Sequence, residues 1–192
     1  YTHMLRRTAA QGTSNTARMT DKITQQALRL NTLIDQMLDV SRLRRGQFVI
    51  QRQPVDIGAV VALVVDEFRT TLPPDSKHAI QLSHPNEPVI VAGDVQRLEQ
   101  VIVNLLSNAV KYSPMGGAVQ IRVIPIATDV HVEVEDQGIG IPADAQARLF
   151  EPFYRANNVG PMASGFGLGL HIVREIVQRH GGRIEIESAE GP

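Results

Sequence analysis

The sequence predicts an α+β protein, a two-layer α/β sandwich over residues 48–192 preceded by a partial antiparallel helical hairpin over residues 1–47. Three observations lead to this fold class. Apolar residues recur at three- and four-residue steps through residues 19–47, and short strand and helix patterns replace them after Gly46. The strands come in runs with helices grouped between them, without strict β-α-β alternation. With 192 residues, of which 43% are hydrophobic and 20% charged, the chain can bury its own core.

The first 47 residues are predicted to form two antiparallel helices of unequal length. Residues 19–47 give a helix of about 43 Å and residues 1–10 one of only about 15 Å, at a rise of ~1.5 Å per residue. The polar residues 11–16 between them are expected to form the turn. We therefore expect the chain to begin partway along its first helix. The apolar stripe of the long helix predicts pairing with its own copy in a homodimer.

The remaining residues are predicted to form short strands and four helices. The predicted strands are residues 48–52, 79–82, 89–92, 119–126, 130–135 and 183–187. The predicted helices are residues 57–71, 95–112, 143–149 and 168–180.

Composition and charge exclude several classes of function. The net charge is −1, with 19 basic and 20 acidic residues, so nucleic acid is not an expected partner. The absence of Cys excludes thiolate metal sites and thiol nucleophiles, and it fits a reducing, cytoplasmic compartment. No run approaches the ~20 apolar residues needed to span a bilayer, so any membrane anchor is expected outside this segment.

The predicted helix 95–112 carries a narrow polar stripe on an otherwise apolar surface. At about 100° per residue, the stripe contains Arg97, Gln100, Asn104, Asn108 and Lys111. A solvent-exposed edge is the ordinary explanation of such a stripe. Two asparagines four residues apart favour a polar ligand instead, because Asn is a poor helix former. An Asn carbonyl oxygen suits Mg²⁺, and Lys111 one turn later can hold a phosphate.

A second candidate site follows the predicted strand 130–135. Valines at alternate positions share one face of this strand, and Asp136 is expected to continue that buried face. A buried carboxylate needs a donor, and the Gly-containing residues 137–142 form a turn that is open to a planar ligand. An exocyclic amine of adenine would suit, although Asp-x-Gly alone usually marks only a turn.

The third candidate site is a run of alternating glycines, Gly165, Gly167 and Gly169, directly before an apolar-periodic helix. Backbone amides at a helix start approach anions closely, so this pattern predicts phosphate binding. The spacing matches neither the phosphate-loop motif nor the dinucleotide-binding motif. Residues 156–164 before it are expected to form a mobile lid over the ligand.

In this order, the motifs resemble those of the ATPase domain of sensor histidine kinases, over roughly residues 19–190. The N box is matched by residues 104–114 (NLLSNAVKYSP), the first glycine box by 136–142 (DQGIGIP), the F box by 149–155 (LFEPFYR) and the second glycine box by 165–173 (GFGLGLHIV). Residues 33–42 (LIDQMLDVSR) resemble the second helix of the family's dimerization and phosphotransfer domain. Four ordered motifs are far more specific than any one of them.

The resemblance implies a Bergerat-type ATP-binding fold and a histidine protein kinase with ATP and Mg²⁺ as ligands. Such an enzyme transfers the ATP γ-phosphate to a histidine of the dimerization domain, for relay to an aspartate in the receiver domain of a response regulator. The resemblance implies that Asp136 recognises adenine, that Asn108 ligates Mg²⁺ and that Arg155 reaches the γ-phosphate. Transfer to a histidine nitrogen requires positioning and charge neutralisation more than a strong base.

The same resemblance implies a larger set of site residues. Phe153 and Tyr154 would anchor the base of the lid, and the catalytic residues would be Asn104, Lys111 and Arg155. The full ATP-binding set would be Asn104, Asn108, Lys111, Tyr112, Asp136, Gly138, Gly140, Ile141, Phe153, Tyr154, Arg155, Gly165, Phe166, Gly167, Leu168, Gly169 and Leu170.

The sequence departs from the family pattern at both ends. The family's phosphoacceptor box has an acid after the histidine and a later proline, whereas His3 is followed by Met4 and the box lacks the proline. We therefore expect the acceptor histidine upstream of Tyr1 and no self-phosphorylation of this chain. At the other end, the family normally continues past Gly191 into a closing strand. The remaining histidines show no metal-ligand spacing and are expected to be structural or exposed.

Two alternatives remain open on the sequence. The first is a hydrolase of the same ATPase superfamily, which carries a Glu as general base four residues before the metal-binding Asn. Here that position is Asn104, whose amide cannot take a proton from water. The second is a helical interaction module whose second domain binds nucleotide only as a signal.

Overall fold

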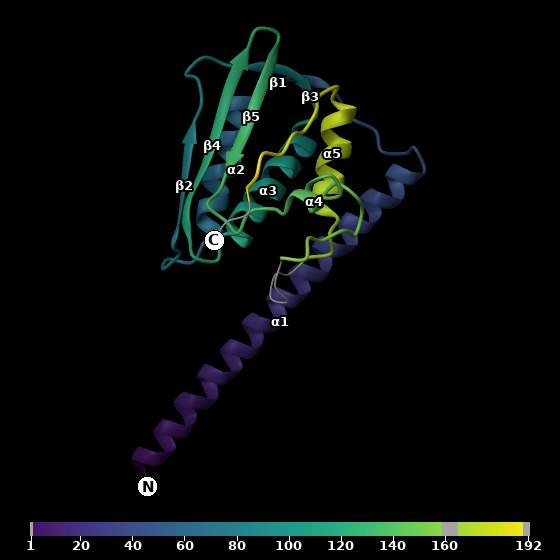
Figure 1. Ribbon diagram of the computed structural model, residues 1–192. Helices are drawn as coiled ribbons and strands as arrows, with labels where there is room; N and C mark the ends of the chain where they lie inside the picture. The colour runs from purple at the N-terminus through teal and green to yellow at the C-terminus, as the bar shows by residue number, and fades with distance from the viewer. Residues whose placement is uncertain (1, 159–164, 190–192) are drawn as a thin grey trace. The chain divides into compact units, whose positions relative to one another are not determined.

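The computed structural model describes residues 2–158 and 165–189. In its first helix, it describes side chains from residue 19 onward, except at 21, 22, 25 and 29. The chain divides into two compact units, Tyr1–Arg45 and Gly46–Pro192. The first unit is built on helix α1, and the second contains every strand and the other helices that the structure describes (Figure 1).

Helix α1 is continuous from Thr2 to Arg44, so the predicted hairpin is wrong. The expected turn at residues 11–16 lies inside the helix. These polar residues disfavour a helix by less than about 1 kcal/mol each and include no proline, so the helical hydrogen bonds continue through them. Arg42 and Arg44 in the last turn complement the helix dipole. Within residues 2–158 and 165–189, no helix has both the length and the apolar character to cross a bilayer.

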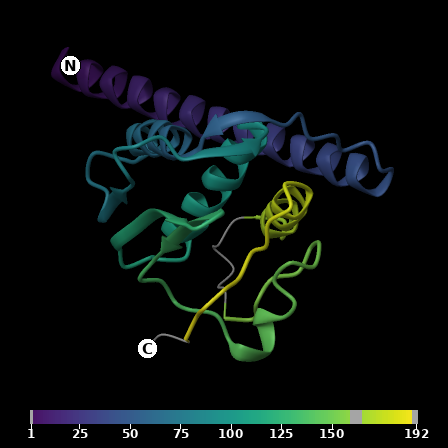
Figure 2. The same ribbon diagram turned by 90° about the horizontal axis from the view of Figure 1, so that it is seen from above.

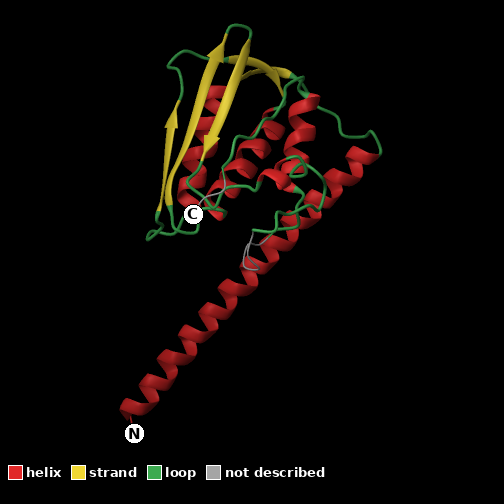
Figure 3. Ribbon diagram, viewed as in Figure 1, coloured by secondary structure: helices red, strands yellow, loops and turns green. Residues whose placement is uncertain are grey.

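The second unit contains two small sheets (Figure 3). Strand β1 (Gln53–Asp56) pairs antiparallel with β3 (Ile90–Gly93). In the larger sheet, β4 (Gly117–Ile126) lies between β2 (His78–Ser83), which is parallel to it, and β5 (Asp129–Glu135), which is antiparallel. The first strand was predicted at residues 48–52 and instead starts at Gln53, because the ladder with β3 begins there.

Helices α2 (Ile57–Thr71) and α3 (Val95–Lys111) pack on one face of the larger sheet, and α5 (Gly169–Arg179) packs on α3 (Figures 1 and 2). The short α4 (Ala143–Gln146) ends three residues before its predicted boundary. The core between these layers consists of fully buried aliphatic side chains, among them Val61, Leu106, Val119, Ile121 and Ile172. The two-layer α/β arrangement predicted for this unit is therefore confirmed.

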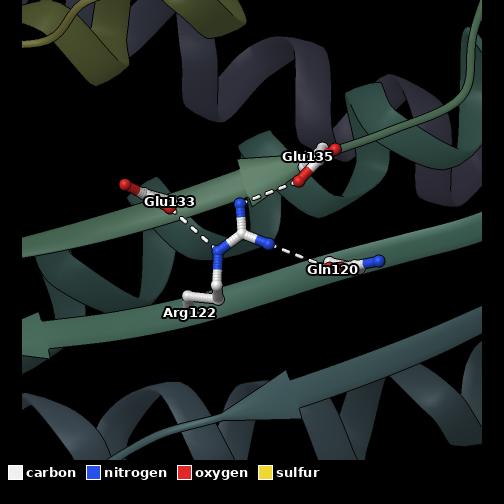
Figure 4. Close-up of polar contacts among 4 residues, drawn as sticks. All are labelled: Gln120, Arg122, Glu133 and Glu135. Atoms are coloured by element: carbon white, nitrogen blue, oxygen red, sulfur yellow. Dashed lines mark hydrogen bonds and ion pairs between the residues drawn. The ribbon is translucent and has the colours of Figure 1, made fainter.

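The opposite face of the larger sheet is polar. Val119, Ile121 and Val123 of β4 are buried, so the alternating residues Gln120 and Arg122 point to the other side. Figure 4 shows the Arg122 guanidinium bonded across the strands to Glu133 and Glu135 and along its own strand to Gln120. The pKa of Arg122 is raised above its ordinary value, most by the hydrogen bond to Glu133 and next by the hydrogen bond to Glu135.

The predicted strand 183–187 is not part of a sheet. Residues 183–189 run back from α5 as an extended segment, with Ile184 and Ile186 half-buried between exposed neighbours (Figures 2 and 3). The period-two pattern therefore identified the extended conformation correctly. It did not identify a partner, because the pattern fixes which side chains are covered and not where the backbone hydrogen bonds go.

A hydrogen-bonded junction fixes the start of α3. One carboxylate oxygen of Asp94 caps the helix by accepting from the Arg97 amide at 3.3 Å, and the other accepts from the Gln51 amide at 3.0 Å. The Asp94 amide in turn donates to His180 Nε2, at 3.0 Å, just after α5. Phe48 is buried beside this junction, with the Arg97 guanidinium 4.3 Å from its ring centroid.

Replacing Asp94 by Ala should lower the free energy of unfolding by about 2 kcal/mol, because both the helix cap and the acceptor for Gln51 are lost. Asp66→Ala is the matched control: among the described residues Asp66 pairs with Arg69 at the surface alone, so its loss should cost less than about 0.5 kcal/mol. Urea unfolding followed by circular dichroism measures both values. Equal effects of the two substitutions would contradict the role of Asp94 as a junction.

Candidate nucleotide-binding site

Helix α3 presents a half-buried polar edge and buries its opposite side. Val101, Ile102, Leu106 and Ala109 are buried, whereas Asn104, Asn108 and Lys111 are half-buried. Val103 is the exception to the predicted apolar surface, with 44% of its side chain exposed. The predicted stripe therefore exists as a distinct edge of the helix, and two segments from later in the chain face it.

Asn104 and Asn108 lie one turn apart on this edge. The Asn104 side-chain nitrogen donates to the Gln100 carbonyl at 2.8 Å. Its oxygen faces the start of α5, since a Cβ built on Gly169 would lie only 2.8 Å from it. In the described part of the chain, the side-chain amide of Asn108 forms no hydrogen bond, so its side-chain oxygen is available to a ligand.

Lys111 ends α3 and faces the glycine run. Its Nζ donates to the Tyr112 hydroxyl at 2.8 Å and lies 4.4 Å from the centroid of that ring. A Cβ built on Gly165 would lie 2.9 Å from Nζ. A phosphate bound by the backbone amides of the glycine run would therefore lie next to the Lys111 ammonium group.

Asp136 is exposed, and the prediction that it lies on the buried face of the strand is wrong. Strand β5 ends at Glu135, and the chain then turns, so the period-two pattern does not extend to Asp136. One carboxylate oxygen accepts from the Gly138 amide at 2.8 Å. The other forms no hydrogen bond to the described residues and can accept one from a ligand.

The turn after Asp136 lies against the end of α3. The Ile139 amide donates to the Tyr112 carbonyl at 3.0 Å. A Cβ on Gly138 would lie 2.5 Å from that same carbonyl oxygen, which explains the glycine. The structure thus brings Asp136 next to the end of the helix that carries Asn108 and Lys111.

The F-box residues 153–155 lie against the glycine run. The Phe153 amide donates to the Gly167 carbonyl at 2.9 Å, and a guanidinium nitrogen of Arg155 lies 3.4 Å from the Gly165 carbonyl. At Gly167, φ is +72° and a Cβ would lie 2.6 Å from the Tyr154 carbonyl oxygen, so only glycine fits there.

The other predicted residues of this region differ in burial. Leu168 is fully buried and anchors the start of α5, whereas Leu170 is half-buried. Phe153 and Phe166 are largely exposed. Of the predicted lid, residues 159–164 lie outside the described residues.

Three residues that the sequence did not single out contact the loop 138–141. Asn158 donates to the Gly140 carbonyl at 3.0 Å, Gln146 donates to the Ile141 carbonyl at 3.2 Å, and the Ser188 hydroxyl accepts from the Ile141 amide at 3.0 Å. No spacing in the sequence signals these contacts, because the residues come from three separate segments.

The donor set also bears on a metal. Among the described residues, no group of three or more His, Cys, Asp or Glu side chains could hold a metal ion. The uncharged oxygen of Asn108 fits Mg²⁺, which is commonly held by few protein ligands together with phosphate oxygens and water.

Comparison with known proteins identifies the family. A family model described as "Histidine kinase-, DNA gyrase B-, and HSP90-like ATPase" matches residues 93–192. The chain is 35% identical over 171 residues to the probable sensor histidine kinase TcrY of Mycobacterium tuberculosis, covering 88% of this chain and 35% of TcrY. The chain thus spans about a third or less of the length of the first curated relatives.

Solved histidine kinases share the fold. Acinetobacter baumannii AdeS superimposes with a TM-score of 0.71 and 26% identity, covering 88% of this chain and 77% of AdeS. Full-length ShkA in complex with AMPPNP gives a TM-score of 0.65 and 27% identity, over 84% of this chain and 34% of ShkA. Together, the matched residues, the fold and the ordered motifs show that the chain belongs to the histidine kinase-, DNA gyrase B-, and HSP90-like ATPase family, as the ATP-binding domain of a sensor histidine kinase.

Proposed function

We propose that the polar edge of α3, the loop 136–141 and the glycine run 165–169 form one binding site for Mg²⁺ and ATP. The observation that carries the proposal is that both the loop and the glycine run meet the same edge of α3, at Tyr112 and at Asn104 and Lys111. Asp136 accepts a hydrogen bond from the adenine amine with its unbonded oxygen. The glycine run and Lys111 hold the phosphates. The binding of AMPPNP by the related ShkA supports an ATP-like ligand here.

Three polar side chains serve the phosphate end of this site. Asn108 holds Mg²⁺ through its amide oxygen, and the ion supplies charge neutralisation to the phosphate oxygens. Arg155, whose guanidinium lies by the Gly165 carbonyl, reaches the γ-phosphate. Asn104 faces the start of α5 and orients the phosphate chain.

The reaction that these groups serve is transfer of the γ-phosphate to a histidine of a dimerization domain. The histidine nitrogen attacks the γ-phosphorus, an N–P bond forms, the bond to the β-phosphate oxygen breaks and ADP leaves. Asn104, at the position of the hydrolases' general base, cannot take a proton from water, so hydrolysis as the main activity is not favoured. We expect the phosphate to pass to a response regulator receiver domain in the cytoplasm.

Asp136→Asn and Asn108→Ala should each weaken binding of Mg²⁺ and ATP by at least about tenfold, because the first disturbs the base contact and the second removes the metal ligand. Asp129→Asn, at the start of β5, and Asn86→Ala are matched controls at exposed positions and should bind normally. Isothermal titration calorimetry on variants with native circular dichroism spectra gives the affinities. Normal affinity in both site variants would remove the site assignment.

We also propose that α1 pairs with its copy in a homodimer. Met19, Ile23, Leu30, Ile34 and Met37 recur along α1 at helical spacing and are exposed, so they form an apolar stripe without cover in one chain. Ile34→Glu should therefore shift the sedimentation-equilibrium mass towards the monomer, and Thr32→Glu on the opposite side of the helix should not. If the unaltered chain itself sediments as a monomer at all accessible concentrations, the pairing is refuted.

His3 is not expected to accept phosphate. It lies in α1, but its neighbour Met4 cannot act as a base, and the acid and the proline of the family's acceptor box are missing. Incubation with γ-labelled ATP should therefore leave the chain unlabelled, although it binds ATP. Acid-labile, alkali-stable label on His3 would overturn this expectation. Transfer to a full-length partner dimer would show that the catalytic site itself is competent.

A further inference from the structure

Besides its contact with α3, the loop 136–141 is held by side chains that lie outside the family motifs. Ser188 and Gln146 connect this loop to the extended segment 183–189 and to the end of α4. The Ser188 hydroxyl accepts from the Ile141 amide at 3.0 Å. Gln146 Nε2 donates both to the Ile141 carbonyl at 3.2 Å and to the Ser188 carbonyl at 2.9 Å. Both polar groups of the Ile141 backbone are thereby bound by these two residues.

The chemistry of the two side chains fits this role closely. A primary amide nitrogen carries two N–H donors, and Gln146 directs them at two carbonyl oxygens from different segments. Neither Glu nor a hydrophobic residue could make these bonds, and a carboxylate would face two oxygens with no proton between them. Both side chains are half-buried, which limits competition from water.

The loop itself lacks regular structure that could fix its shape. It follows the last residue of β5, and Gly140 has φ +66°. Within the described residues, the Ile139 amide donates to the carbonyl of Tyr112, just after α3, Gln137 accepts from the Ala118 amide of β4, and Asn158 donates to the Gly140 carbonyl. At the end of the loop, the hydrogen bonds of Ile141 to Ser188 and Gln146 fix both polar groups of its last backbone unit, and they connect it to α4 and to the extended segment 183–189.

We propose that Ser188 and Gln146 are positioning residues for base recognition, because they hold the loop that places Asp136 against the adenine ring. This inference rests on the nucleotide site proposed above. The two residues do not touch the ligand. Their loss leaves the phosphate-binding groups on α3 and in the glycine run in place, so the selectivity for the base changes more than the binding of the phosphates.

The test compares the affinities for ATP and GTP, each with Mg²⁺, by calorimetry on the whole chain. Ser188→Ala and Gln146→Glu should each weaken ATP binding at least about fivefold and narrow the preference for ATP over GTP, as expected for loss of one or two hydrogen bonds that place a ligand group. Ser188→Thr keeps the hydroxyl and should restore both values. Ser83→Ala and Gln178→Glu make the same chemical changes at exposed positions and should bind as the unaltered chain does.

Amide hydrogen exchange of the ligand-free chain adds a direct measurement. The Ile141 amide should lose protection in Ser188→Ala, while core amides of α3 keep theirs. Unchanged ATP affinity in Ser188→Ala and Gln146→Glu, or an equal loss for ATP and GTP that follows a lowered melting temperature, would overturn the positioning role alone. If the unaltered chain does not bind ATP, the proposed function fails, and the inference fails with it.

Discussion

The structure of the second unit depends on one helix that must satisfy two environments at once. Helix α3 buries Leu106 and Ala109 against the other layers, and its opposite edge carries amides and a lysine that are only half-buried. Burying the apolar side fixes the rotation of the helix, since a turn of about 100° would move the asparagines into the core. Core packing thus fixes the direction in which the polar groups point.

The surrounding segments depend on this orientation. The loop after β5 reaches the C-terminal end of α3 at Tyr112, and the start of α5 approaches Asn104 so closely that a Cβ at residue 169 would lie 2.8 Å from the Asn104 side-chain oxygen. Phe153 and Arg155 then lie against the glycine run, through backbone and guanidinium contacts.

The elements with strong local signals could be predicted from the sequence. The predicted helix 95–112 differs from the observed α3 by one residue, and 57–71 coincides with α2, because Asp94 and Asp56 cap these helices. The ordered motifs also identified the family. The elements that depend on partners could not be predicted in this way. The predicted hairpin was wrong because polar residues alone do not end a helix. The predicted strand 183–187 was wrong because alternating apolar residues in the sequence do not specify which strand they pair with.

The junction at Asp94 connects the start of α3 to the end of α5. The two helices are joined at one end, where His180 accepts from the Asp94 amide, and they face each other across Asn104 and Gly169 nearer the other end. A small change in the angle between the two helices would therefore displace Asn104 from Gly169 by more than it displaces Asp94 from His180. Phe48 is buried at this junction, with the Arg97 guanidinium of α3 and the Arg179 guanidinium of α5 at 4.3 and 5.7 Å from its ring centroid, so a substitution of Phe48 would act on both helices where they are joined.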